Sequence, residues 1–378
     1  MKKICVITTI ETTMEAFVIP AMREFVKQGY QVSLICSMSD DFKRKYSEEF
    51  NLIPINMVRG VSIKEMLTKP IEFYKVFKKE KFDYVQYATT NAAWYASVAA
   101  WLARVPIRVN CLWGLLYSAD SGLKRWVKKI IEKVPCIFSN RFLVASHKNL
   151  DLAVNDRLCR RDRALVIGDG GTVGVDLQQF DVLQREQLKQ EMLNRYPSLD
   201  GKTVFGYLGR IDVDKGINEL LEAFLMLNKS DASLLLIGPL DDLRSGLRQD
   251  LLNQARAHKN IIFTGFTSEV PLHLSAVDVL VHPTYREGFS MVIQQAMAMG
   301  CAVITTDIPG PSEVIETDKS GLLVPVKDSA ALNCAMDRLY SDNSLRKQFV
   351  TDGLKRVREK FSRDRMVRLN FENRWTID

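Results

Sequence analysis

Two polar loops in the second half of the chain contain the residue types that bind phosphates and sugars. The first loop, GRIDVDKG at residues 209–216, directly follows an apolar run of strand length. Two fixed cations in one loop can stabilise a diphosphate as its negative charge grows during a reaction. We therefore expect Arg210 and Lys215 to act on a phosphate-bearing ligand, and the alternative is that both are solvated loop charges.

The second loop, residues 283–290, follows the apolar run that ends at His282, and it contains Glu287. Ser290 can cap the helix that follows, and Gly300 can end it. The N–H groups at such a helix start attract anions, and doubly wound sheets bind ligands at the carboxyl ends of their strands. Glu287 beside an anion site suits a hydroxylated, phosphate-bearing ligand, although the same carboxylate could simply cap the helix.

The elements that must position these loops repeat a strand–helix pattern along the whole chain. Continuous apolar strands separated by helices predict a parallel sheet covered on both faces. The predicted strands are residues 4–8, 31–36, 84–86, 108–113, 141–145, 164–167, 204–208, 233–237, 261–264, 279–282, 302–305 and 321–324. The predicted helices are residues 14–28, 92–103, 123–134, 217–227, 243–257, 291–299, 330–339 and 344–361.

The pattern predicts two doubly wound α/β domains, the first at residues 1–170 and the second at residues 171–361. The glycine-rich segment GDGGTVG, residues 168–174, lies where they join and could be a dinucleotide-binding loop. That motif needs a helix N-terminus directly behind it, and no long amphipathic helix follows here. We interpret the segment as a flexible crossing between the domains.

The composition is that of a globular protein with reduced thiols. Of the 378 residues, 47% are hydrophobic and 26% are charged, which excludes a disordered, coiled-coil or collagen-like chain. The longest apolar stretch, residues 92–103, is shorter than the roughly 20 residues of a membrane-spanning helix, and residues 1–8 fit a first strand better than a signal sequence. Seven cysteines without a C-x-x-C pair and four histidines without metal-binding spacing predict a cytoplasmic protein with no zinc site.

The net charge of +7 is unevenly distributed along the chain. Residues 1–170 carry 27 Lys and Arg against 17 Asp and Glu, whereas residues 171–378 carry 25 against 28. A basic surplus can attract nucleic acid, anionic lipid or a phosphorylated substrate. Because the chain has neither zinc-finger spacing nor an aromatic RNA-binding motif, nucleic acid is not the expected partner.

The helix predicted at residues 123–134 is the most strongly amphipathic in the chain. Its apolar residues recur at positions 123, 126, 127, 130, 131 and 134, and Lys and Arg fill most of the remaining positions. Such a helix can lie on an anionic membrane surface, or it can pack its apolar face on the sheet with its cations in water. Both can hold at once, because the cations can contact lipid head groups while the apolar face stays in the core. The residues expected to face a membrane are Lys124, Arg125, Lys128 and Lys129.

Together the two loops and their surroundings resemble the retaining glycosyltransferases of the GT-B fold, in particular the large family 4. The resemblance rests on GRIDVDKGINELLEAF, FTGFTSEVPLHLSAVDVLVHPTYREGFSMVIQQAMAMGCAVITTDIPGPSEVI and GLLVPVKD, which follow one another in that family's order. It covers most of residues 164–340, and the N-terminal half by pattern. It implies two Rossmann-like domains facing a central cleft. The N-terminal domain would bind the acceptor and carry the last helix, at about 362–378, and the C-terminal domain would bind a nucleotide-sugar donor.

The resemblance also assigns roles to the residues of the two loops. Arg210 and Lys215 would contact the donor diphosphate and Glu287 the hydroxyls of the transferred sugar, which makes these three the expected catalytic residues. The amides of residues 288–290 would meet sugar and phosphate, and residues 265–266 would line the nucleoside pocket. The expected donor-binding residues are Gly209, Gly265, Phe266, Gly288, Phe289, Ser290, Met291 and Gln295.

The sequence departs from the family pattern at three places. Gln295 stands where a second glutamate usually contacts the donor ribose, and an amide can still accept and donate there. The first loop has Thr9, Glu11 and Thr12 where many members have glycine, and we expect these residues to bind acceptor or donor. Trp113 stands before Gly114 where many members have His or Arg, which affects donor specificity.

The loop at residues 209–216 also contains Asp212-Val213-Asp214, a D-x-D pattern that binds metal in the other large glycosyltransferase fold. Because it lies beside the cations of this loop, we interpret the two acids as solvated loop carboxylates. The sequence therefore predicts no essential metal and no cofactor, with the nucleotide-sugar as a substrate.

The predicted function is the transfer of a sugar from a nucleotide-sugar, expected to be a UDP-sugar, to a glycan acceptor. The expected acceptor is linked to a polyprenyl diphosphate, and the process would be bacterial surface-polysaccharide, O-antigen or capsule biosynthesis. The protein would act from the cytoplasm as a peripheral protein on the inner face of the cell membrane. A GT-B nucleotide-sugar epimerase and a nucleotide-sugar-binding pseudoenzyme are the alternatives, and the oligomeric state is not predicted.

Overall fold

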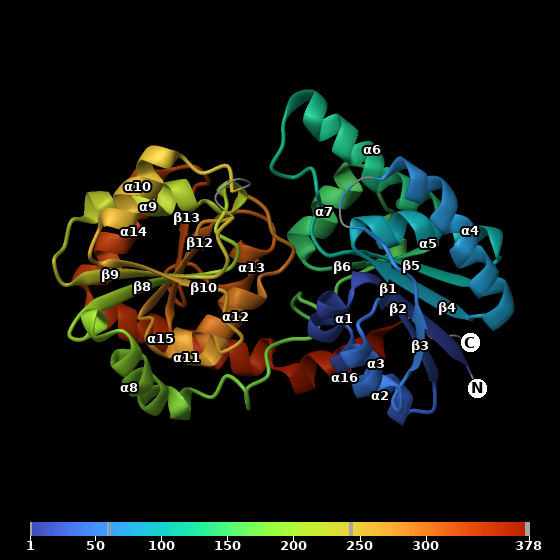
Figure 1. The fold of residues 1–378 in the computed structure, drawn as a ribbon, viewed down its shortest axis with the longest axis horizontal. Helices are drawn as coiled ribbons and strands as arrows, with labels where there is room; N and C mark the ends of the chain where they lie inside the picture. Colours follow the sequence, from blue (N-terminus) through green and yellow to red (C-terminus); the bar gives the residue numbers. More distant parts are fainter. Residues whose placement is uncertain (1, 59, 61, 242–244, 375–378) are drawn as a thin grey trace. The chain divides into compact units, whose positions relative to one another are not determined.

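The structure is a computed structural model of the chain that describes residues 2–58, 60, 62–241 and 245–374. The chain divides into two compact units, an N-terminal unit of Met1–Val173 with Arg363–Asp378 and a C-terminal unit of Gly174–Ser362 (Figure 1). The predicted join at residue 170 lies close to this division, and the last helix belongs to the N-terminal unit. The acceptor-binding and donor-binding roles of the two units stay predictions.

In the described part of the N-terminal unit, seven parallel strands form one sheet in the order β3-β2-β1-β4-β5-β6-β7. The strands are β1 (Lys3–Ile10), β2 (Gln31–Ser37), β3 (Asn51–Pro54), β4 (Tyr84–Ala88), β5 (Ile107–Leu112), β6 (Arg141–Val144) and β7 (Ala164–Leu165). The helices are α1 (Glu11–Phe17), α2 (Ile19–Lys27), α3 (Asp40–Tyr46), α4 (Ile63–Glu80), α5 (Thr90–Leu102), α6 (Gly122–Phe138), α7 (His147–Asn155) and α16 (Arg363–Asn373).

Both faces of the N-terminal sheet are buried, because alternate residues of its strands enter different cores. On β1, Ile4 and Val6 pack with α1, α2 and Met366 of α16, whereas Cys5 and Ile7 pack with α4 and α5. Figure 1 shows these two sets of helices on opposite sides of the sheet. This arrangement explains why the strands are continuous apolar runs rather than alternating ones.

In the described part of the C-terminal unit, six parallel strands form a second sheet in the order β10-β9-β8-β11-β12-β13. The strands are β8 (Thr203–Leu208), β9 (Ala232–Ile237), β10 (Ile261–Gly265), β11 (Val279–His282), β12 (Ala302–Thr306) and β13 (Leu322–Val324). The helices are α8 (Arg185–Arg195), α9 (Ile217–Leu227), α10 (Gln249–Ala257), α11 (Val270–Ser275), α12 (Met291–Ala298), α13 (Pro311–Val314), α14 (Ser329–Ser341) and α15 (Asn343–Lys360).

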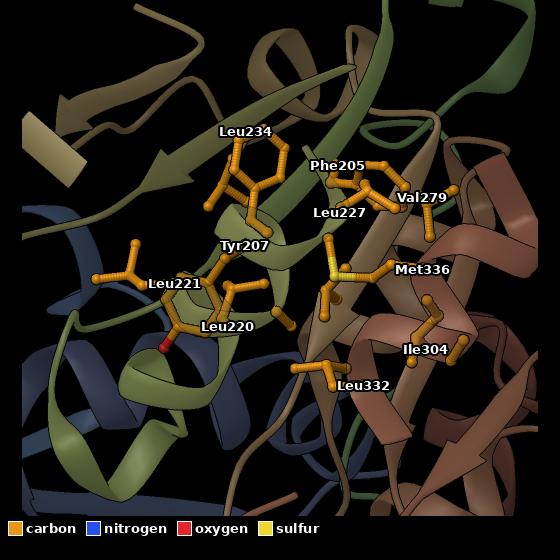
Figure 2. Close-up of a cluster of buried hydrophobic side chains, with 14 of the residues drawn as sticks. Phe205, Tyr207, Leu220, Leu221, Leu227, Leu234, Val279, Ile304, Leu332 and Met336 are labelled. Carbon is orange, nitrogen blue, oxygen red and sulfur yellow. The ribbon is translucent and has the colours of Figure 1, made fainter. Parts of the chain in front are cut away.

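One core of this unit lies between the sheet and helices α9, α10 and α14, and Figure 2 shows its side chains. Phe205 and Tyr207 of β8 point into it beside Leu220 of α9 and Met336 of α14. Helices α11, α12 and α15 lie over the other face (Figure 1). The predicted pair of doubly wound α/β domains is therefore confirmed.

Each sheet has one topological switch point, where the strand order reverses. It lies between β1 and β4 in the N-terminal unit and between β8 and β11 in the C-terminal unit. At a switch point the connections on either side run to opposite faces, which leaves a crevice at the carboxyl ends of the two strands. Residues 209–216 and 283–290 follow β8 and β11, so the two loops singled out in the sequence share the second switch point.

Some predicted elements differ from those observed. The single helix expected at residues 14–28 is two helices, α1 and α2, because the backbone breaks at Val18 before Pro20 opens α2. The helix expected at 243–257 is described from Gln249 onward, and its predicted start falls at residues outside the described part. Helix α4 was not predicted, since Pro70 within it resembles a helix break.

Helix α6 is oriented differently from an ordinary helix of an α/β domain. The side chains of Leu123, Trp126, Val127 and Ile130 on its apolar face are exposed, Leu123 by 76% and Trp126 by 60%. The buried residues of α6 include Glu132, whose carboxylate accepts a 2.7 Å hydrogen bond from the Leu116 amide. The interpretation in which the apolar face packs on the sheet is therefore wrong.

Ion pairs with two acids outside α6 account for this orientation. Asp156 binds Arg125 at 2.9 Å and Lys129 at 2.6 Å, and Asp120 binds Lys128 at 2.6 Å and Lys124 at 3.0 Å. Burial of Asp156 opposes ionisation, but Lys129 and Arg125 outweigh it and hold its pKa below the ordinary value. Because these pairs hold the cationic side against the unit, the apolar side is left outward. Contact of these four cations with a membrane stays a prediction.

Within the described ranges, no helix is both long and apolar enough to cross a bilayer.

The two loops at the second switch point fit together only because Gly216 has no side chain. Its φ is +72°, and a Cβ there would lie 2.0 Å from the carbonyl oxygen of Pro283. We predict that Gly216→Ala lowers the free energy of unfolding by about 2–5 kcal/mol, because left-handed strain of about 1–2 kcal/mol adds to an overpacking cost of about 1–3 kcal/mol.

Urea unfolding of the full chain measures this effect. Gly201→Ala is the matched control, because Gly201 also has a positive φ, +69°, but a Cβ there meets no atom within 4 Å. The control should lose only the strain of about 1–2 kcal/mol. Equal losses in the two variants would show that the close approach to Pro283 does not restrict this loop.

Candidate functional site

The candidate site is built at the carboxyl ends of β8 and β11, which are neighbours in the sheet. Backbone contacts join the loops that follow them, since the Tyr285 amide donates to the Asp214 carbonyl at 3.0 Å. On the far side of the second loop, Gly310 lies so close that a Cβ would be 2.1 Å from the carbonyl oxygen of Gly288. The backbone of residues 283–290 is therefore held from both sides.

An ion pair between Lys215 and Glu287 lies at the centre of the site. The Lys215 ammonium is 2.7 Å from the Glu287 carboxylate, and their side chains are 19% and 28% exposed. Burial alone would raise the pKa of Glu287, but the charge of Lys215, together with His282 beside it, holds that pKa well below its ordinary value. Glu287 is therefore ionised at neutral pH, and it can accept hydrogen bonds from hydroxyl groups.

His282 belongs to this cluster, and the sequence did not single it out. Its Nε2 lies 3.7 Å from the Glu287 carboxylate and 3.3 Å from Ser290 Oγ, and its ring stacks on Tyr207 with centroids 6.4 Å apart. Burial lowers the pKa of His282, so the ring is neutral near pH 7. The available signal was its position as the last residue of β11, directly before the loop that carries Glu287.

Arg210 is the most accessible charged group of the site. Its side chain is 67% exposed, and its guanidinium lies 2.6 Å from Asp212. The Tyr207 hydroxyl donates to the Arg210 carbonyl at 2.7 Å and so fixes the backbone from which the side chain extends. Because the guanidinium has five donors, it can keep Asp212 and still bind a phosphate.

The two acids of the D-x-D pattern have different surroundings. Asp212 is not a solvated carboxylate, since its side chain is only 13% exposed and pairs with Arg210. Asp214 is exposed, as expected, and lies 3.4 Å from Arg286. Each acid therefore faces a cation of the site loops.

Helix α12 begins at the second loop with the predicted cap. Ser290 is the N-cap residue, and its Oγ accepts a hydrogen bond from the Ile293 amide at 3.4 Å. Glu287 is not the N-cap residue, so the alternative in which it merely caps the helix receives no support from the cap geometry. The backbone of residues 288–290 thus leads directly into the helix start, where anions are favoured.

The remaining predicted donor-binding residues lie at or near the same edge of the sheet. Gly209 directly follows β8. Gly265 is the last residue of β10, and the side chain of Phe266, the next residue, is 80% exposed. Met291 and Gln295 are one turn apart on α12 and are both partly exposed. The carboxyl ends of parallel strands share one edge, so the sheet brings these groups to one side of the unit. Their roles stay predictions.

In the N-terminal unit, Thr9 is the second-last residue of β1 and Trp113 directly follows β5. Strand β4 lies between these two strands in the sheet. The Trp113 ring lies 5.7 Å from Phe17, and its buried Nε1 has no hydrogen-bond partner among the described residues. Glu11 accepts a 2.6 Å hydrogen bond from the Ser39 amide, and Thr12 is exposed.

Thr89, which the sequence did not single out, completes this edge. It follows β4 with a φ of 70°, a conformation that costs a residue of this kind about 1–3 kcal/mol. Its Oγ1 accepts from the Thr9 amide at 3.2 Å and lies 2.6 Å from Thr9 Oγ1. The sequence signal was weak, a Thr-Thr pair directly after a strand.

Two family models together account for most of the chain. The model described as glycosyl transferase 4-like matches residues 3–146, and the model described as glycosyl transferases group 1 matches residues 189–356. The chain is therefore a glycosyltransferase, with a 4-like N-terminal domain and a group 1 C-terminal domain. The second match contains Arg210, Lys215 and Glu287, so the family predicted from the sequence is confirmed.

Curated relatives of this glycosyltransferase extend over most of its length. It is 29% identical to the capsular polysaccharide biosynthesis glycosyltransferase CapM of Staphylococcus aureus, covering 91% of this chain and 90% of CapM. It is 28% identical to the N,N'-diacetylbacillosaminyl-diphospho-undecaprenol alpha-1,3-N-acetylgalactosaminyltransferase of Campylobacter jejuni, covering 72% and 71%. It is 24% identical to the UDP-Gal:alpha-D-GlcNAc-diphosphoundecaprenol alpha-1,3-galactosyltransferase of Escherichia coli, covering 84% and 82%.

Solved structures share the fold of this glycosyltransferase over nearly its whole length. A glycosyltransferase from Rickettsia africae has a TM-score of 0.77 at 19% identity, covering 98% of this chain and 97% of that one. HepE from Anabaena, in complex with UDP and glucose, has a TM-score of 0.79 at 16% identity, covering 98% and 99%. These neighbours and the two doubly wound sheets establish the GT-B fold.

The cluster of His282 and Glu287 predicts that this glycosyltransferase loses stability in acid. Both pKa values are lower in the folded chain than in the unfolded one, so the unfolded state binds more protons and stability falls as pH falls. The loss through His282 begins below about pH 6.5, and the loss through Glu287 begins below about pH 4.5.

Urea unfolding at pH 7, 6 and 5 measures the first of these losses. We expect His282→Asn to show a smaller decrease in unfolding free energy over this range than the wild type. His147→Asn is the control, because His147 is exposed, and it should keep the wild-type pH dependence. A His282→Asn variant with the full wild-type dependence would contradict a buried, neutral His282.

Proposed function

We propose that this glycosyltransferase moves a sugar from a UDP-sugar to a glycan acceptor linked to a polyprenyl diphosphate, in bacterial surface-polysaccharide assembly such as capsule or O-antigen synthesis. The observation that carries the proposal is the Lys215–Glu287 pair beside Arg210 at the switch point of the C-terminal sheet. The names of the Campylobacter and Escherichia relatives support a diphospho-undecaprenol acceptor, and that of CapM supports polysaccharide synthesis. The UDP complex of a protein with the same fold agrees with a UDP donor.

The cations of the site suit the donor diphosphate. The Lys215 ammonium has three protons and uses one toward Glu287, which leaves two for phosphate oxygens. The exposed guanidinium of Arg210 can bind a second phosphate oxygen without desolvation of its whole side chain. The start of α12 behind residues 288–290 adds the favourable end of a helix dipole.

The carboxylate of Glu287 suits the sugar. It is ionised and partly exposed, and Lys215 fixes its orientation. Hydrogen bonds from sugar hydroxyls to an ionised carboxylate are strong and directional. The same ion pair therefore places the sugar next to the cations that bind its leaving group.

The proposed transfer retains the anomeric configuration of the donor. The bond between the sugar C1 and the β-phosphate oxygen breaks, and the acceptor hydroxyl oxygen forms a new bond to C1 from the same face. The hydroxyl proton passes to the departing phosphate, which becomes UDP. Arg210 and Lys215 stabilise the negative charge that grows on that phosphate, the task that a metal performs in other transferases.

The acceptor is proposed to bind the N-terminal unit at its own switch point. Thr9 and Thr89 place two hydroxyls there, and the strained φ of Thr89 indicates a conformation that the surrounding structure maintains. A lipid-linked acceptor places the enzyme at the inner face of the cell membrane, as a peripheral protein. Nucleotide-sugar, glycan acceptor and anionic lipid are thus its proposed partners, and no cofactor is proposed.

Replacement of both cations tests the proposal directly. We predict that Arg210→Ala/Lys215→Ala lowers the transfer rate by at least about 10²–10³-fold, the usual loss when one charge-stabilising donor is removed. The double variant Lys229→Ala/Arg248→Ala is the control, because these two residues also pair with acids but lie outside the site loops. It should keep wild-type activity.

A panel of nucleotide-sugars with a diphospholipid acceptor, in buffer with EDTA, provides the assay. Proton NMR of the wild-type product should show the anomeric configuration of the donor. Transfer that survives in the Arg210/Lys215 variant, an inverted product, or loss of activity with EDTA would each overturn the corresponding part of the proposal. Release of an epimerised sugar, or UDP binding without turnover, would support the other two functions considered for the sequence.

Glu287 should affect transfer more than it affects nucleotide binding. We predict that Glu287→Ala lowers the transfer rate by about 10²–10³-fold and changes the dissociation constant of UDP by less than about fivefold. Glu287→Gln should recover part of the rate, because an amide still accepts hydrogen bonds. Calorimetry and the transfer assay measure the two quantities, and equal losses in both would indicate a structural role instead.

A further inference from the structure

The apolar face of α6 consists of Leu123, Trp126, Val127, Ile130 and Ile137, which follow the helical repeat along one side. All five side chains are exposed, Ile137 by 64%. The opposite side of the helix is fixed by the ion pairs to Asp120 and Asp156, so this apolar face cannot turn inward without breaking them. Helix α6 thus presents its apolar face outward as part of the folded structure.

The exposed apolar surface continues onto the neighbouring helix α5. Trp101 and Leu102, the last residues of α5, are about half exposed. The Trp101 ring lies 5.4 Å from the ring of Phe138, which ends α6. Helices α5 and α6 contact each other, and Figure 1 shows them on the same side of the N-terminal sheet. Contiguous apolar surface of this kind marks a site of association with a partner or a membrane.

A pocket rich in arginine opens at the C-terminal end of the same face. Its volume is about 710 Å³. Ile137 belongs both to the apolar face and to the pocket wall, and Phe142 and Leu158 give the pocket an apolar lining. The basic residues that line it are Lys133, Arg157, Arg160, Arg161 and Arg163, against the single acid Asp162.

The charges of this arginine pocket are only partly neutralised. Arg160 pairs with Asp162 and Arg161 pairs with Asp151, both at the exposed surface, where water and salt screen such pairs. Lys133, Arg157 and Arg163 have no ion pair within the described ranges of the chain. The pocket therefore suits an anion with several oxygens, and its apolar lining suits a ligand with an attached hydrocarbon.

The pocket lies away from the edge that carries the acceptor residues. Phe142 is at the start of β6, and residues 161–163 directly precede β7, so the pocket opens near the amino ends of these strands. Thr9, Thr89 and Trp113 lie at the carboxyl ends of β1, β4 and β5. The pocket is therefore a separate feature of the N-terminal unit.

We propose that the apolar face of α6 and the arginine pocket form one docking surface for an anionic lipid bilayer. The apolar side chains, with Trp126 among them, enter the boundary between headgroups and acyl chains, and a lipid phosphate occupies the pocket. Apolar and aromatic residues on one side of a helix with cations at its border are the pattern of interfacial helices. The proposal rests on the proposed function only for the expectation that the acceptor is membrane-bound.

This assignment changes which residues of α6 meet the membrane. Arg125, Lys128 and Lys129 are engaged by acids of their own unit, whereas the apolar face and the arginine pocket are directed outward. A stripe of cations alone would give binding that high salt abolishes. A docking surface with an apolar face retains part of its affinity in salt and needs anionic lipid for the rest.

Flotation of the full-length protein with vesicles tests the proposal. One set of vesicles is pure phosphatidylcholine, and the other contains about 30% of the anionic lipid phosphatidylglycerol. The wild type should bind the anionic vesicles at least about tenfold more tightly than the neutral ones, since each cation near such a surface contributes about fivefold. Trp126→Ser/Ile130→Ser should lose binding to both, and Arg157→Gln/Arg163→Gln should lose only the preference for anionic vesicles.

Matched controls come from the C-terminal unit. Leu183→Ser/Met226→Ser removes two exposed apolar side chains, and Lys347→Gln/Arg358→Gln removes two exposed cations. Neither change should alter vesicle binding. If Trp126→Ser/Ile130→Ser fails to fold, Leu123→Ser/Ile137→Ser tests the same face.

Transfer to a water-soluble acceptor separates this proposal from the proposed function. With this acceptor, all docking variants should keep the wild-type transfer rate. If the wild type transfers no sugar to it, the proposed function is overturned, whereas vesicle binding is unaffected. Unchanged vesicle binding in Trp126→Ser/Ile130→Ser would overturn the docking surface. So would a wild-type dimer that the same substitutions dissociate, or full competition of inorganic phosphate with the anionic vesicles.

Discussion

The ion pair between Lys215 and Glu287 is the contact around which the candidate site is arranged. The two residues are 72 positions apart in the chain, and their side chains meet 2.7 Å apart because β8 and β11 are neighbours at the switch point. The pair needs Gly216 beneath Pro283 and the α12 cap at Ser290, which bring the loops to this distance. A partly buried pair of this kind resists separation, since either charge left alone would be costly. The pair is therefore preorganised, and in the proposed function its carboxylate binds the sugar hydroxyls and its ammonium binds the phosphate.

A second set of ion pairs determines which side of helix α6 is exposed in the N-terminal unit. Asp120 and Asp156 bind the cationic side of α6, and its apolar side is consequently outward. The usual preference for burying the apolar side of a helix is thus reversed by charges outside the helix. Both units contain the same interaction, a carboxylate and a cation that the fold holds close together, but its structural effect differs between them. In the C-terminal unit it lies at the centre of the candidate site, and in the N-terminal unit it leaves the apolar side of α6 exposed.

The sequence predicted the elements that have strong local signals and missed those without them. Continuous apolar runs identified most strands, and α5, α9 and α12 were predicted close to their observed bounds. Helix α4 was missed because Pro70 lies inside it, and α8 because Met192 is its only buried residue among the described ones. In the site, Arg210, Lys215 and Glu287 could be found from their loops. His282 could not be found in this way, because it resembles the last residue of an ordinary strand. Thr89 could not be found either, because its position depends on a strained φ.

The sequence by itself determined the fold class, the family and the loops that carry the site, because these depend on hydrophobic periodicity and on motifs that are contiguous in the chain. Only the tertiary structure decided the pairing of Lys215 with Glu287, the burial of Asp212 and the neutral state of His282. It also decided the outward orientation of α6. Each of these depends on charges and carbonyl groups brought together from distant parts of the chain. A periodic pattern indicates that a helix has an apolar side, but the partners of its other side decide where that apolar side faces.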